Sequence, residues 1–429
     1  MESLTLKEFL GYIKDELIVY DKRTHWNIEA SKIIKENEGK PIFFKNIADS
    51  KYSLLANTLY SRQILHRLLK TKSDEELYLR FLNALSKPKQ LASETIDSYY
   101  TKLKNVNMYE MPILKFYPKD GGRYVTSAII LAGNGEGNFN ASIHRLMLID
   151  KNKFVVRIVP RHLYTILAKF KGEGKNLPVI VLIGTHPLVM LSAVFSPPYG
   201  IYEMEVANSI LDGAIKADYL TKMEIPVPLI SEMIWVGEIN PDEFHSEGPF
   251  VDILGIYDIV RQQPILHVKE VWIRGEQPIF QEILPGGIEH KLLMGFPREV
   301  AIWDAVRKII PKVKSVRLTR GGAGWLHAII SIEKQSEGDG KNAILAAFAA
   351  HPSLKHVVVV DSDINIDNLE DVEWAIATRF RADKDLIVIK NIKGSTLDPV
   401  SENNLTAKMG LDATRPLSKP KVLFEKAKL

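Results

Sequence analysis

The spacing of apolar residues changes twice along the chain, and each change predicts a new region. Up to about residue 100, apolar positions recur at helical intervals, as at Leu6, Phe9 and Ile13, around a short strand pattern; this predicts a small α/β unit. From about residue 105 to 295, short apolar runs separated by turn residues predict mostly strands. After Pro297, helix and strand patterns alternate, which predicts a covered α/β layer.

These patterns and a length of 429 residues predict a mixed α/β (α+β) protein of three domains. The expected domains are residues 1–100, 101–296 and 297–429. The polar run 86–101 is expected to be a linker. The sequence after Asp398 has little periodicity and ends in a lysine-rich stretch, so we expect a tail that lies on a neighbouring subunit.

The central region carries a hairpin signal. Two apolar runs, 145–149 and 154–159, flank the polar turn Asp150–Lys153, which predicts two paired strands that bring Arg145 close to Arg157. Three further apolar runs predict one strand followed by two helices, over residues 179–183, 188–195 and 202–214.

Composition narrows the class of protein. Apolar residues make up 46% of the chain and charged residues 25%, which is typical of a globular protein with an ample core. No apolar run approaches the roughly 20 residues that cross a bilayer, and no signal-peptide pattern is present, so we expect a cytoplasmic protein without a membrane partner. The absence of cysteine excludes disulfides and thiol nucleophiles. The net charge of +4 is scattered, so nucleic acid is not an expected partner.

The segment Gly137–Arg145, with the sequence GNFNASIHR, concentrates polar groups of different kinds. Asn140 lies in this segment, and His162 and Glu203 follow at long intervals. An amide, an imidazole and a carboxylate together suit a divalent cation. Because the three residues are separated by far more than one helical turn, no local rule makes them ligands, and spacing alone favours three unrelated polar residues.

The hexapeptide EGPFVD places two carboxylates, Glu247 and Asp252, on either side of the turn-forming pair Gly248–Pro249. Two acids that converge on Arg145 would leave one ionised against the guanidinium and the other able to hold a proton. Taken alone, however, the motif favours an acid-rich surface turn. A second acidic motif, DSD at 361–363, follows a strand pattern, but no further ligands lie near it in sequence, so we expect a capped turn rather than a Mg²⁺ site.

Six segments, in order, resemble motifs of the UbiD family of decarboxylases over about residues 40 to 415. They are GNFNASIHR, the segment from Arg157 to His162, EMEVAN with Glu203, EGPFVD, DSDINIDNLEDVEWAIATR from Asp361, and AKMGLDAT from Ala407. Within the family the chain is most similar to the archaeal branch. It departs from the family pattern at Val251, where glycine is usual.

The resemblance implies a fold and two kinds of cofactor. The implied fold has an N-terminal α/β domain, a central split β-barrel that binds prenylated FMN, and a C-terminal α/β domain with an oligomerising tail. A divalent cation is implied to bridge the cofactor phosphate to Asn140, His162 and Glu203, often with K⁺ nearby. One imidazole nitrogen and two oxygen donors favour Mn²⁺ slightly over Mg²⁺.

Carried over residue by residue, the resemblance also assigns roles in catalysis and cofactor binding. The implied catalytic set is Arg145, Glu247 and Asp252, with Asp252 as the proton donor. The residues implied to contact the cofactor are Ile143, His144, Arg145, Arg157, Ile158, Val159, His162 and Lys408. We expect His144 and Arg161 to add positive charge for the phosphate of either the substrate or the cofactor.

The implied reaction is the non-oxidative decarboxylation of an α,β-unsaturated acid. The archaeal branch points to trans-anhydromevalonate 5-phosphate, converted to isopentenyl phosphate in the archaeal mevalonate pathway. Two alternatives stay open: a 3-polyprenyl-4-hydroxybenzoate decarboxylase of quinone synthesis, and a subunit of a multi-subunit carboxylase. The implied partners are a small phosphorylated unsaturated acid, a flavin prenyltransferase that supplies the cofactor, and further copies of the chain in a homo-oligomer, either a dimer or a hexamer.

Overall fold

The computed structural model describes residues 4–220 and 224–427, and the chain divides into two compact units. The first unit contains residues 1–65 and 80–293, and the second contains residues 66–79 and 294–429. Helices and strands are mixed in both units, which confirms the predicted α/β class, whereas the division into three domains stays a prediction. Among the described residues, no helix has the length and apolar character that crossing a bilayer requires.

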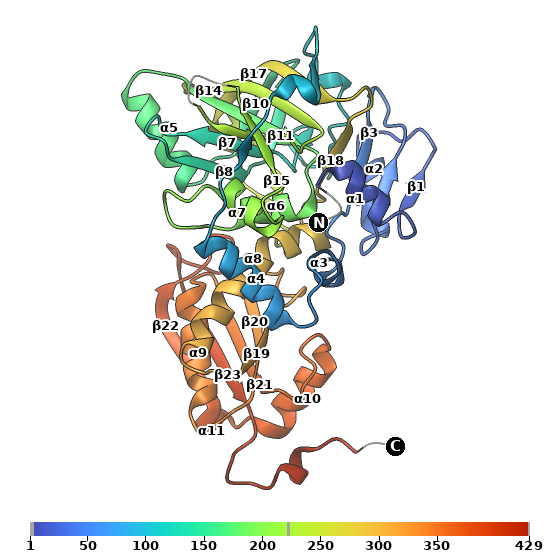
Figure 1. Cartoon of the computed structure of the whole chain (residues 1–429). Helices are drawn as coiled ribbons and strands as arrows, with labels where there is room; N and C mark the ends of the chain where they lie inside the picture. Colours follow the sequence, from blue (N-terminus) through green and yellow to red (C-terminus); the bar gives the residue numbers. More distant parts are fainter. Residues whose placement is uncertain (1–3, 221–223, 428–429) are drawn as a thin grey trace. The chain divides into compact units, whose positions relative to one another are not determined.

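The N-terminal part of the first unit is a four-stranded sheet with two helices (Figure 1). The strands follow the order β1 (Ile18–Tyr20), β2 (Ile42–Phe44), β3 (Ser53–Ala56) and β18 (Ile279–Glu282). The helices are α1 (Leu6–Tyr12) and α2 (Glu29–Glu36). The predicted helical face is confirmed, since α1 buries Leu6 and Phe9. Thr5 and Glu8 form a capping box that satisfies N–H groups of the first turn of α1.

A nine-stranded sheet forms the centre of the first unit. Eight strands follow the order β6-β9-β10-β17-β14-β11-β7-β8, and β5 pairs with β17. Their bounds are β5 (Tyr100–Lys102), β6 (Tyr124–Val125), β7 (Ile129–Gly133), β8 (Phe139–Ile143), β9 (Leu146–Asp150), β10 (Lys153–Val156), β11 (Leu177–Ile183), β14 (Met233–Glu247) and β17 (Arg261–Arg274). The described strands β6 and β8 lie at the two ends of this order and do not pair with each other, so the sheet is open and the split barrel stays a prediction.

The predicted hairpin is confirmed. Strands β9 and β10 are antiparallel, with Leu148 opposite Phe154. The backbone N–H of Arg157 donates to the carbonyl of Arg145 at 3.2 Å, so the two arginines leave the sheet side by side. The ring of Phe154 stacks on that of Trp235 of β14, with centroids 5.5 Å apart, which anchors the hairpin in the core.

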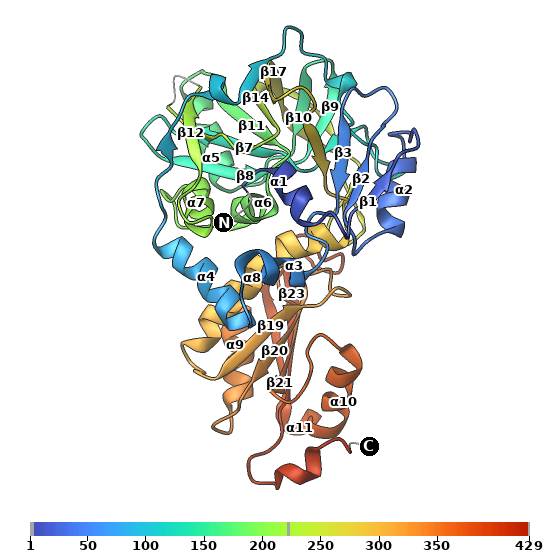
Figure 2. The same cartoon turned by 45° about the vertical axis from the view of Figure 1, so that its right-hand side comes forward.

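Three helices contact β8: α5 (His162–Gly172), α6 (Pro187–Val194) and α7 (Glu203–Ile210). The last two lie side by side next to β8 in Figure 2, as predicted for two helices that follow β11. Helix α6 contains no charged residue and is almost fully buried, because an all-apolar helix gains by being covered on every side. The N-terminal ends of α5 and α7 carry His162 and Glu203, respectively.

The expected linker at 86–101 is wrong. This run includes β4 (Ala92–Ser93) and the 3₁₀ helix η1 (Ile96–Ser98), and it ends in β5. Strand β4 pairs with β12 (Lys216–Tyr219), which also pairs with β13 (Pro226–Pro228). Polar residues at a sheet edge form the backbone hydrogen bonds between strands as well as apolar residues do. The polarity of this segment therefore did not distinguish it from a linker. The remaining short elements of this unit are η2 (Met108–Glu110), β15 (Phe250–Val251) and β16 (Tyr257–Asp258).

The second unit contains a five-stranded sheet with helices, as the alternating pattern predicted. The strand order is β19 (Val313–Leu318), β20 (His327–Ile332), β21 (His356–Asp361), β23 (Leu405–Ala413) and β22 (Leu386–Lys393). The three central strands are parallel, and the two edge strands are antiparallel to their neighbours. The accompanying helices are α9 (Asp339–Ala350), α10 (Leu369–Arg379) and α11 (Ala382–Asp385).

Three helices contain residues of both units: α3 (Arg62–Leu69), α4 (Asp74–Ser86) and α8 (Ile288–Arg307).

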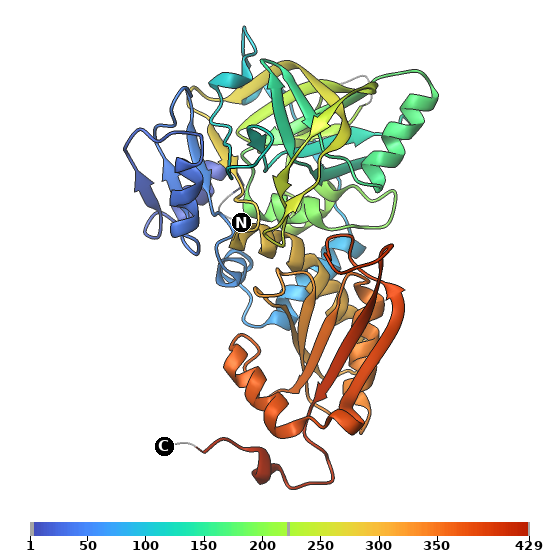
Figure 3. The same cartoon turned by 180° about the vertical axis from the view of Figure 1, so that it is seen from behind.

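The sequence after Asp398 is not wholly an irregular tail. Residues 405–413 form β23, the dark red strand that lies among the orange strands in Figure 3. The described residues beyond it include the short 3₁₀ helix η3 (Lys421–Phe424), and the carbonyl of Phe424 accepts a hydrogen bond from Arg379 at 3.0 Å. The placement of the tail on a neighbouring subunit stays a prediction.

The acidic motif at 361–363 is a structural turn, as expected. Arg379 donates to Asp361 at 2.5 Å and to both carboxylate oxygens of Asp363, at 2.9 and 2.8 Å. The guanidinium of Arg379 is fully buried and neutralises the pair of acids. The two aspartates are therefore used to hold α10 against the end of β21, with no need for a metal ion.

Candidate active site

The centre of the candidate site is a buried ion pair between Arg145 and Glu247. Arg145 lies in the link between β8 and β9, and Glu247 is the last residue of β14. Nε of Arg145 donates to Oε1 of Glu247 at 2.9 Å, and Nη2 donates to Oε2 at 2.8 Å. Only 11% of the arginine side chain and none of the glutamate side chain is exposed. Two parallel hydrogen bonds fix the plane of the guanidinium, and burial makes breaking the pair costly.

Aromatic side chains support this pair. The hydroxyl of Tyr124 donates to Oε1 of Glu247 at 3.2 Å and accepts from the N–H of Gly248 at 3.1 Å. Burial and the charge of Glu247 raise the pKa of Tyr124, so the phenol keeps its proton and remains a donor. The ring of Phe250 lies 4.6 Å from the guanidinium carbon of Arg145, which adds a cation–π contact.

Two aspartates face the end of the guanidinium that Glu247 does not use. Oδ2 of Asp252 lies 3.6 Å from Nη1 of Arg145, and Oδ2 of Asp258 lies 3.2 Å from Nη2. Both belong to the hairpin of β15 and β16, in which Val251 pairs with Tyr257. Glu247 and Asp252 therefore converge on Arg145, the set that the family resemblance implied, and Glu247 is buried rather than placed on the surface turn that EGPFVD alone favours. The catalytic roles of the three residues stay predictions.

Asp258 is a site residue that the sequence analysis missed. Its carboxylate is 2.5 Å from Nη1 of Arg261 and 3.8 Å from Nε of Arg157, in addition to its contact with Arg145. Burial opposes its ionisation, but the hydrogen bond and charge of Arg261, together with the charge of Arg145, hold the pKa of Asp258 below its usual range. The Leu254-Gly255 turn could have indicated the hairpin that brings Asp258 back beside Asp252.

The loop before Phe250 is held by a close backbone approach. The N–H of Gly121 donates to the carbonyl of Pro249 at 2.8 Å. A Cβ atom at Gly121 would overlap the carbonyl oxygen of Gly248, so no other residue fits there without moving the loop. The Gly248–Pro249 peptide bond is cis.

A directional chain of hydrogen bonds orients Asn140. Nδ1 of His144 is 3.0 Å from the carbonyl of Arg157, so Nδ1 carries the proton, and Nε2 accepts from the hydroxyl of Ser142 at 2.8 Å. The Ser142 oxygen in turn accepts from the amide nitrogen of Asn140 at 2.9 Å. The amide oxygen of Asn140 is then the atom suited to a cation.

His144 is not the cation that the sequence suggested. Burial lowers the pKa of His144 to about 4, with a further small lowering by the charge of Arg161, so the imidazole is neutral near pH 7. The expectation that His144 adds positive charge for a phosphate is therefore wrong. Arg161 is exposed at the start of α5.

Asn140, His162 and Glu203 lie on neighbouring elements. Asn140 is on β8, and helices α5 and α7, which begin with His162 and Glu203, both contact this strand. Oε2 of Glu203 accepts the N–H of Ala141 at 2.7 Å. The imidazole of His162 packs edge-on against the ring of Tyr199, with centroids 5.7 Å apart.

This donor set fits a divalent cation. Burial raises the pKa of Glu203 to about 8, although the N–H of Ala141 opposes the shift. No group of three or more His, Asp and Glu side chains that could hold a metal occurs in residues 4–220 and 224–427. The expected set contains only two such residues, since its third member is Asn140. The metal role of the set stays a prediction.

The other expected cofactor residues lie in different surroundings. Ile143 ends β8 opposite Ile129. The N–H of Ile158 donates to the side chain of Gln263 at 2.8 Å, and Val159 is 36% exposed. Lys408 belongs to the second unit, where its ammonium donates to the carbonyl of Pro352 at 2.6 Å and burial lowers its pKa to about 8. The cofactor contacts of these residues stay predictions.

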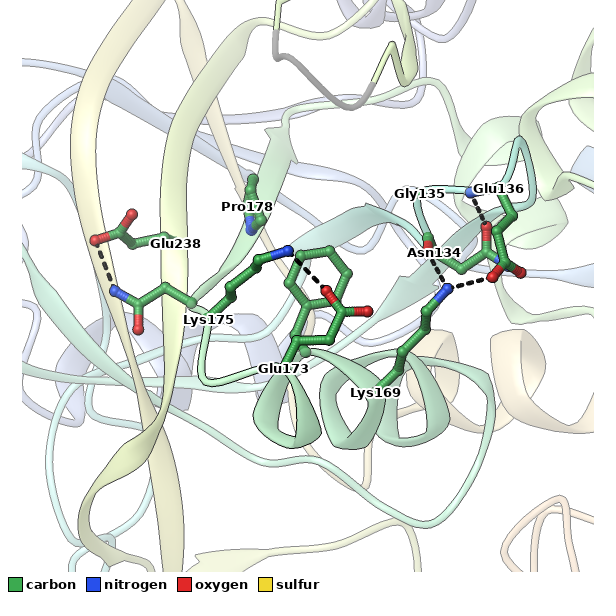
Figure 4. Close-up of a pocket in the computed structure, with 10 residues that line it drawn as sticks. Asn134, Gly135, Glu136, Lys169, Glu173, Lys175, Pro178 and Glu238 are labelled. Carbon is green, nitrogen blue, oxygen red and sulfur yellow. Dashed lines mark hydrogen bonds and ion pairs between the residues drawn. The ribbon is translucent and has the colours of Figure 1, made fainter.

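A surface hollow of about 610 Å³ in the first unit contains none of these residues (Figure 4). Its charged groups are already paired, Lys169 with Glu136 at 2.5 Å and Lys175 with Glu173 at 2.9 Å. Because none of the expected catalytic or cofactor-binding residues lines the hollow, we do not take it as the candidate site. Its lining residues are Asn134, Gly135, Glu136, Lys169, Phe170, Glu173, Lys175, Asn176, Pro178 and Glu238.

Three protein-family models match almost the whole chain. The 3-octaprenyl-4-hydroxybenzoate carboxy-lyase N-terminal domain matches residues 13–84, the Rift-related domain matches residues 90–288 and the C-terminal domain matches residues 291–413. The Arg145 cluster and the Asn140 set both fall within the Rift-related domain.

Individual proteins are similar over the same length. The anhydromevalonate phosphate decarboxylase of Aeropyrum pernix is 43% identical over 97% of this chain and 94% of its own. The UbiD-class enzyme HmfF of Pelotomaculum thermopropionicum, solved with FMN, is 32% identical with a TM-score of 0.95, over 99% of this chain and 97% of its own. An evolved dimeric form of HmfF with prenylated FMN is 31% identical with a TM-score of 0.90, over 99% of both chains.

The metal assignment predicts the effect of Glu203→Gln. The substitution removes the only charged oxygen donor of the set, so the affinity for Mn²⁺ should fall by at least about tenfold, and cofactor retention should fall with it. Isothermal titration calorimetry with Mn²⁺ measures the first effect, and flavin absorbance after gel filtration measures the second. Glu205→Gln, two residues along the same helix, is the matched control. Unchanged Mn²⁺ affinity and retention in Glu203→Gln would remove the metal assignment.

Proposed function

The chain belongs to the UbiD family of carboxy-lyases, and we propose that it decarboxylates trans-anhydromevalonate 5-phosphate with prenylated FMN as cofactor. The observation that carries the proposal is the Arg145 cluster: a buried guanidinium fixed in plane by Glu247 and faced at its free end by Asp252. Similarity to an archaeal anhydromevalonate phosphate decarboxylase along nearly the whole chain supports this substrate.

Each residue of the cluster has one task in this proposal. Arg145 binds the substrate carboxylate through Nη1 and Nη2, since Nε and one side of Nη2 are used by Glu247. Glu247 keeps the guanidinium in plane. Asp252 gives a proton to the carbon that has lost CO₂. Prenylated FMN, when bound, supplies the electron sink for the charge left by CO₂, which no side chain can provide.

The Asn140 set would hold the cofactor phosphate through a divalent cation. The amide oxygen of Asn140, the imidazole of His162 and the carboxylate of Glu203 are proposed ligands for Mn²⁺ or Mg²⁺, with K⁺ nearby. Ile143 and the segment Arg157–Val159 would line the cofactor. A flavin prenyltransferase would supply it, and the chain would act as a homo-oligomer; an evolved form of the related HmfF is dimeric.

The small size of the proposed substrate makes charge the main source of affinity. A six-carbon acid offers little apolar area, and each charge-assisted contact contributes about 1.5 to 3 kcal/mol, so two or three contacts are needed for micromolar binding. Arg145 serves the carboxylate, and His144 is neutral. Arg157 and Arg261, whose side chains are 20% and 34% exposed, both contact Asp258 beside Arg145 and are our candidates to bind the phosphate.

The substrate is tested by a side-by-side assay. The protein is co-expressed with a flavin prenyltransferase and supplied with trans-anhydromevalonate 5-phosphate or with a prenylated 4-hydroxybenzoate. We expect release of CO₂ and formation of isopentenyl phosphate from the first compound and no turnover of the second. A long hydrocarbon tail gains binding free energy by burial against apolar surface, whereas the proposed site consists of charged groups. Turnover of only the aromatic acid would overturn the proposed substrate, and turnover of neither would favour a non-catalytic subunit.

The proton-donor role predicts the effect of Asp252→Asn. The amide cannot give a proton, so kcat should fall by about 10²-fold or more while flavin content stays at the wild-type level. Steady-state kinetics and flavin absorbance measure the two quantities on the same preparation. Asp242→Asn, an exposed aspartate of β14 that is paired with Lys171, is the control and should leave kcat unchanged. Wild-type kcat in Asp252→Asn would exclude this residue as the donor.

A further inference from the structure

The guanidinium of Arg145 offers two edges to carboxylates. The side edge, formed by Nε and Nη2, is filled by Glu247. The end edge, formed by Nη1 and Nη2, faces Oδ2 of Asp252 at 3.6 Å and Oδ2 of Asp258 at 3.2 Å. A substrate carboxylate must use the end edge, because the side edge is closed and Glu247 is fully buried. A carboxylate already near this edge must therefore move when substrate binds.

Asp258 has other partners when it leaves Arg145. Its Oδ1 atom stays 2.5 Å from Arg261, and Arg157 lies 3.8 Å from its Oδ2 atom. Giving up Arg145 leaves Asp258 paired, so the exchange does not strand a half-buried charge. The carboxylate of the substrate then takes the place of the Asp258 carboxylate as the acceptor of the hydrogen bond from Arg145.

Asp258 also separates three cations in the free site. Burial and the charges of Arg261 and Arg145 lower the pKa of Arg157, which reflects repulsion among the three guanidinium groups. Without Asp258 these groups lose their shared counter-charge. The free protein would be less stable, and any anion that enters would be bound more tightly.

We propose that Asp258 is a positioning residue that occupies the substrate-carboxylate position on Arg145 in the free enzyme and yields it to the substrate while remaining paired with Arg261 and Arg157. This inference rests on the proposed function, since it needs Arg145 to receive a carboxylate. It assigns Asp258 two opposite effects: it stabilises the empty site, and it weakens the binding of every carboxylate ligand that competes with it.

The test is Asp258→Asn in the prenylated-FMN holoenzyme. Removing the competing charge should lower KM for trans-anhydromevalonate 5-phosphate by about tenfold, the scale of one charge-assisted contact. The value of kcat should change by much less. Binding of 3-methylbut-2-enoate, an acid without phosphate, should tighten by a similar factor in isothermal titration calorimetry, whereas binding of its uncharged amide should not change. A merely structural role would leave KM unchanged or raise it, and either result overturns the proposal.

A second variant covers the case in which Asp258→Asn does not fold. Arg261→Gln removes the partner that draws Asp258 away, so Asp258 should hold Arg145 more tightly and 3-methylbut-2-enoate should bind more weakly. Equal or tighter binding in this variant would contradict the proposal. The unphosphorylated probe separates the two claims: if wild type does not turn over anhydromevalonate phosphate but Asp258→Asn tightens the probe, the proposed function fails and the role of Asp258 stands.

Discussion

The bidentate ion pair between Arg145 and Glu247 is the constraint on which the rest of the site depends. A buried guanidinium must keep its counter-charge, and Glu247 can supply it only if the end of β14 stays beside the link between β8 and β9. Tyr124 and the close approach of Gly121 hold the turn after Glu247 in place. The long strand β14 therefore carries one carboxylate to Arg145 and leaves the end edge of its guanidinium, Nη1 and Nη2, for the proposed substrate carboxylate.

A network of hydrogen bonds connects Asn140, a member of the candidate metal set, to the backbone beside Arg145. The chain of hydrogen bonds from Asn140 through Ser142 and His144 to the carbonyl of Arg157 runs beside Arg145. It requires a neutral imidazole, and the burial that lowers the pKa of His144 provides one. The segment GNFNASIHR thus contains both Asn140, the proposed metal ligand, and the central Arg145, together with a buried histidine that orients Asn140 through Ser142.

The sequence predicted features that depend on local patterns. The turn between Asp150 and Lys153 indicated the hairpin, whereas the grouping of Arg145, Glu247 and Asp252 was implied by the family resemblance and not by the turn in EGPFVD alone. The sequence did not reveal Asp258, because its importance comes from contacts with Arg145, Arg157 and Arg261, which only the tertiary structure brings together. The sequence also could not predict that His144 is neutral, because its pKa is lowered by burial and burial depends on tertiary packing. Strand β23 was missed because its partners, β21 and β22, supply the burial that its own pattern does not indicate.

The account holds that Arg145 and Glu247 act as one unit, and a double-mutant cycle on kcat/KM for trans-anhydromevalonate 5-phosphate tests this most directly. Arg145→Lys removes the planar fork, and Glu247→Gln removes the charge that orients it. If the two residues act together, the double variant is no slower than the slower single variant. If the two losses multiply, the residues act independently and the central claim is wrong.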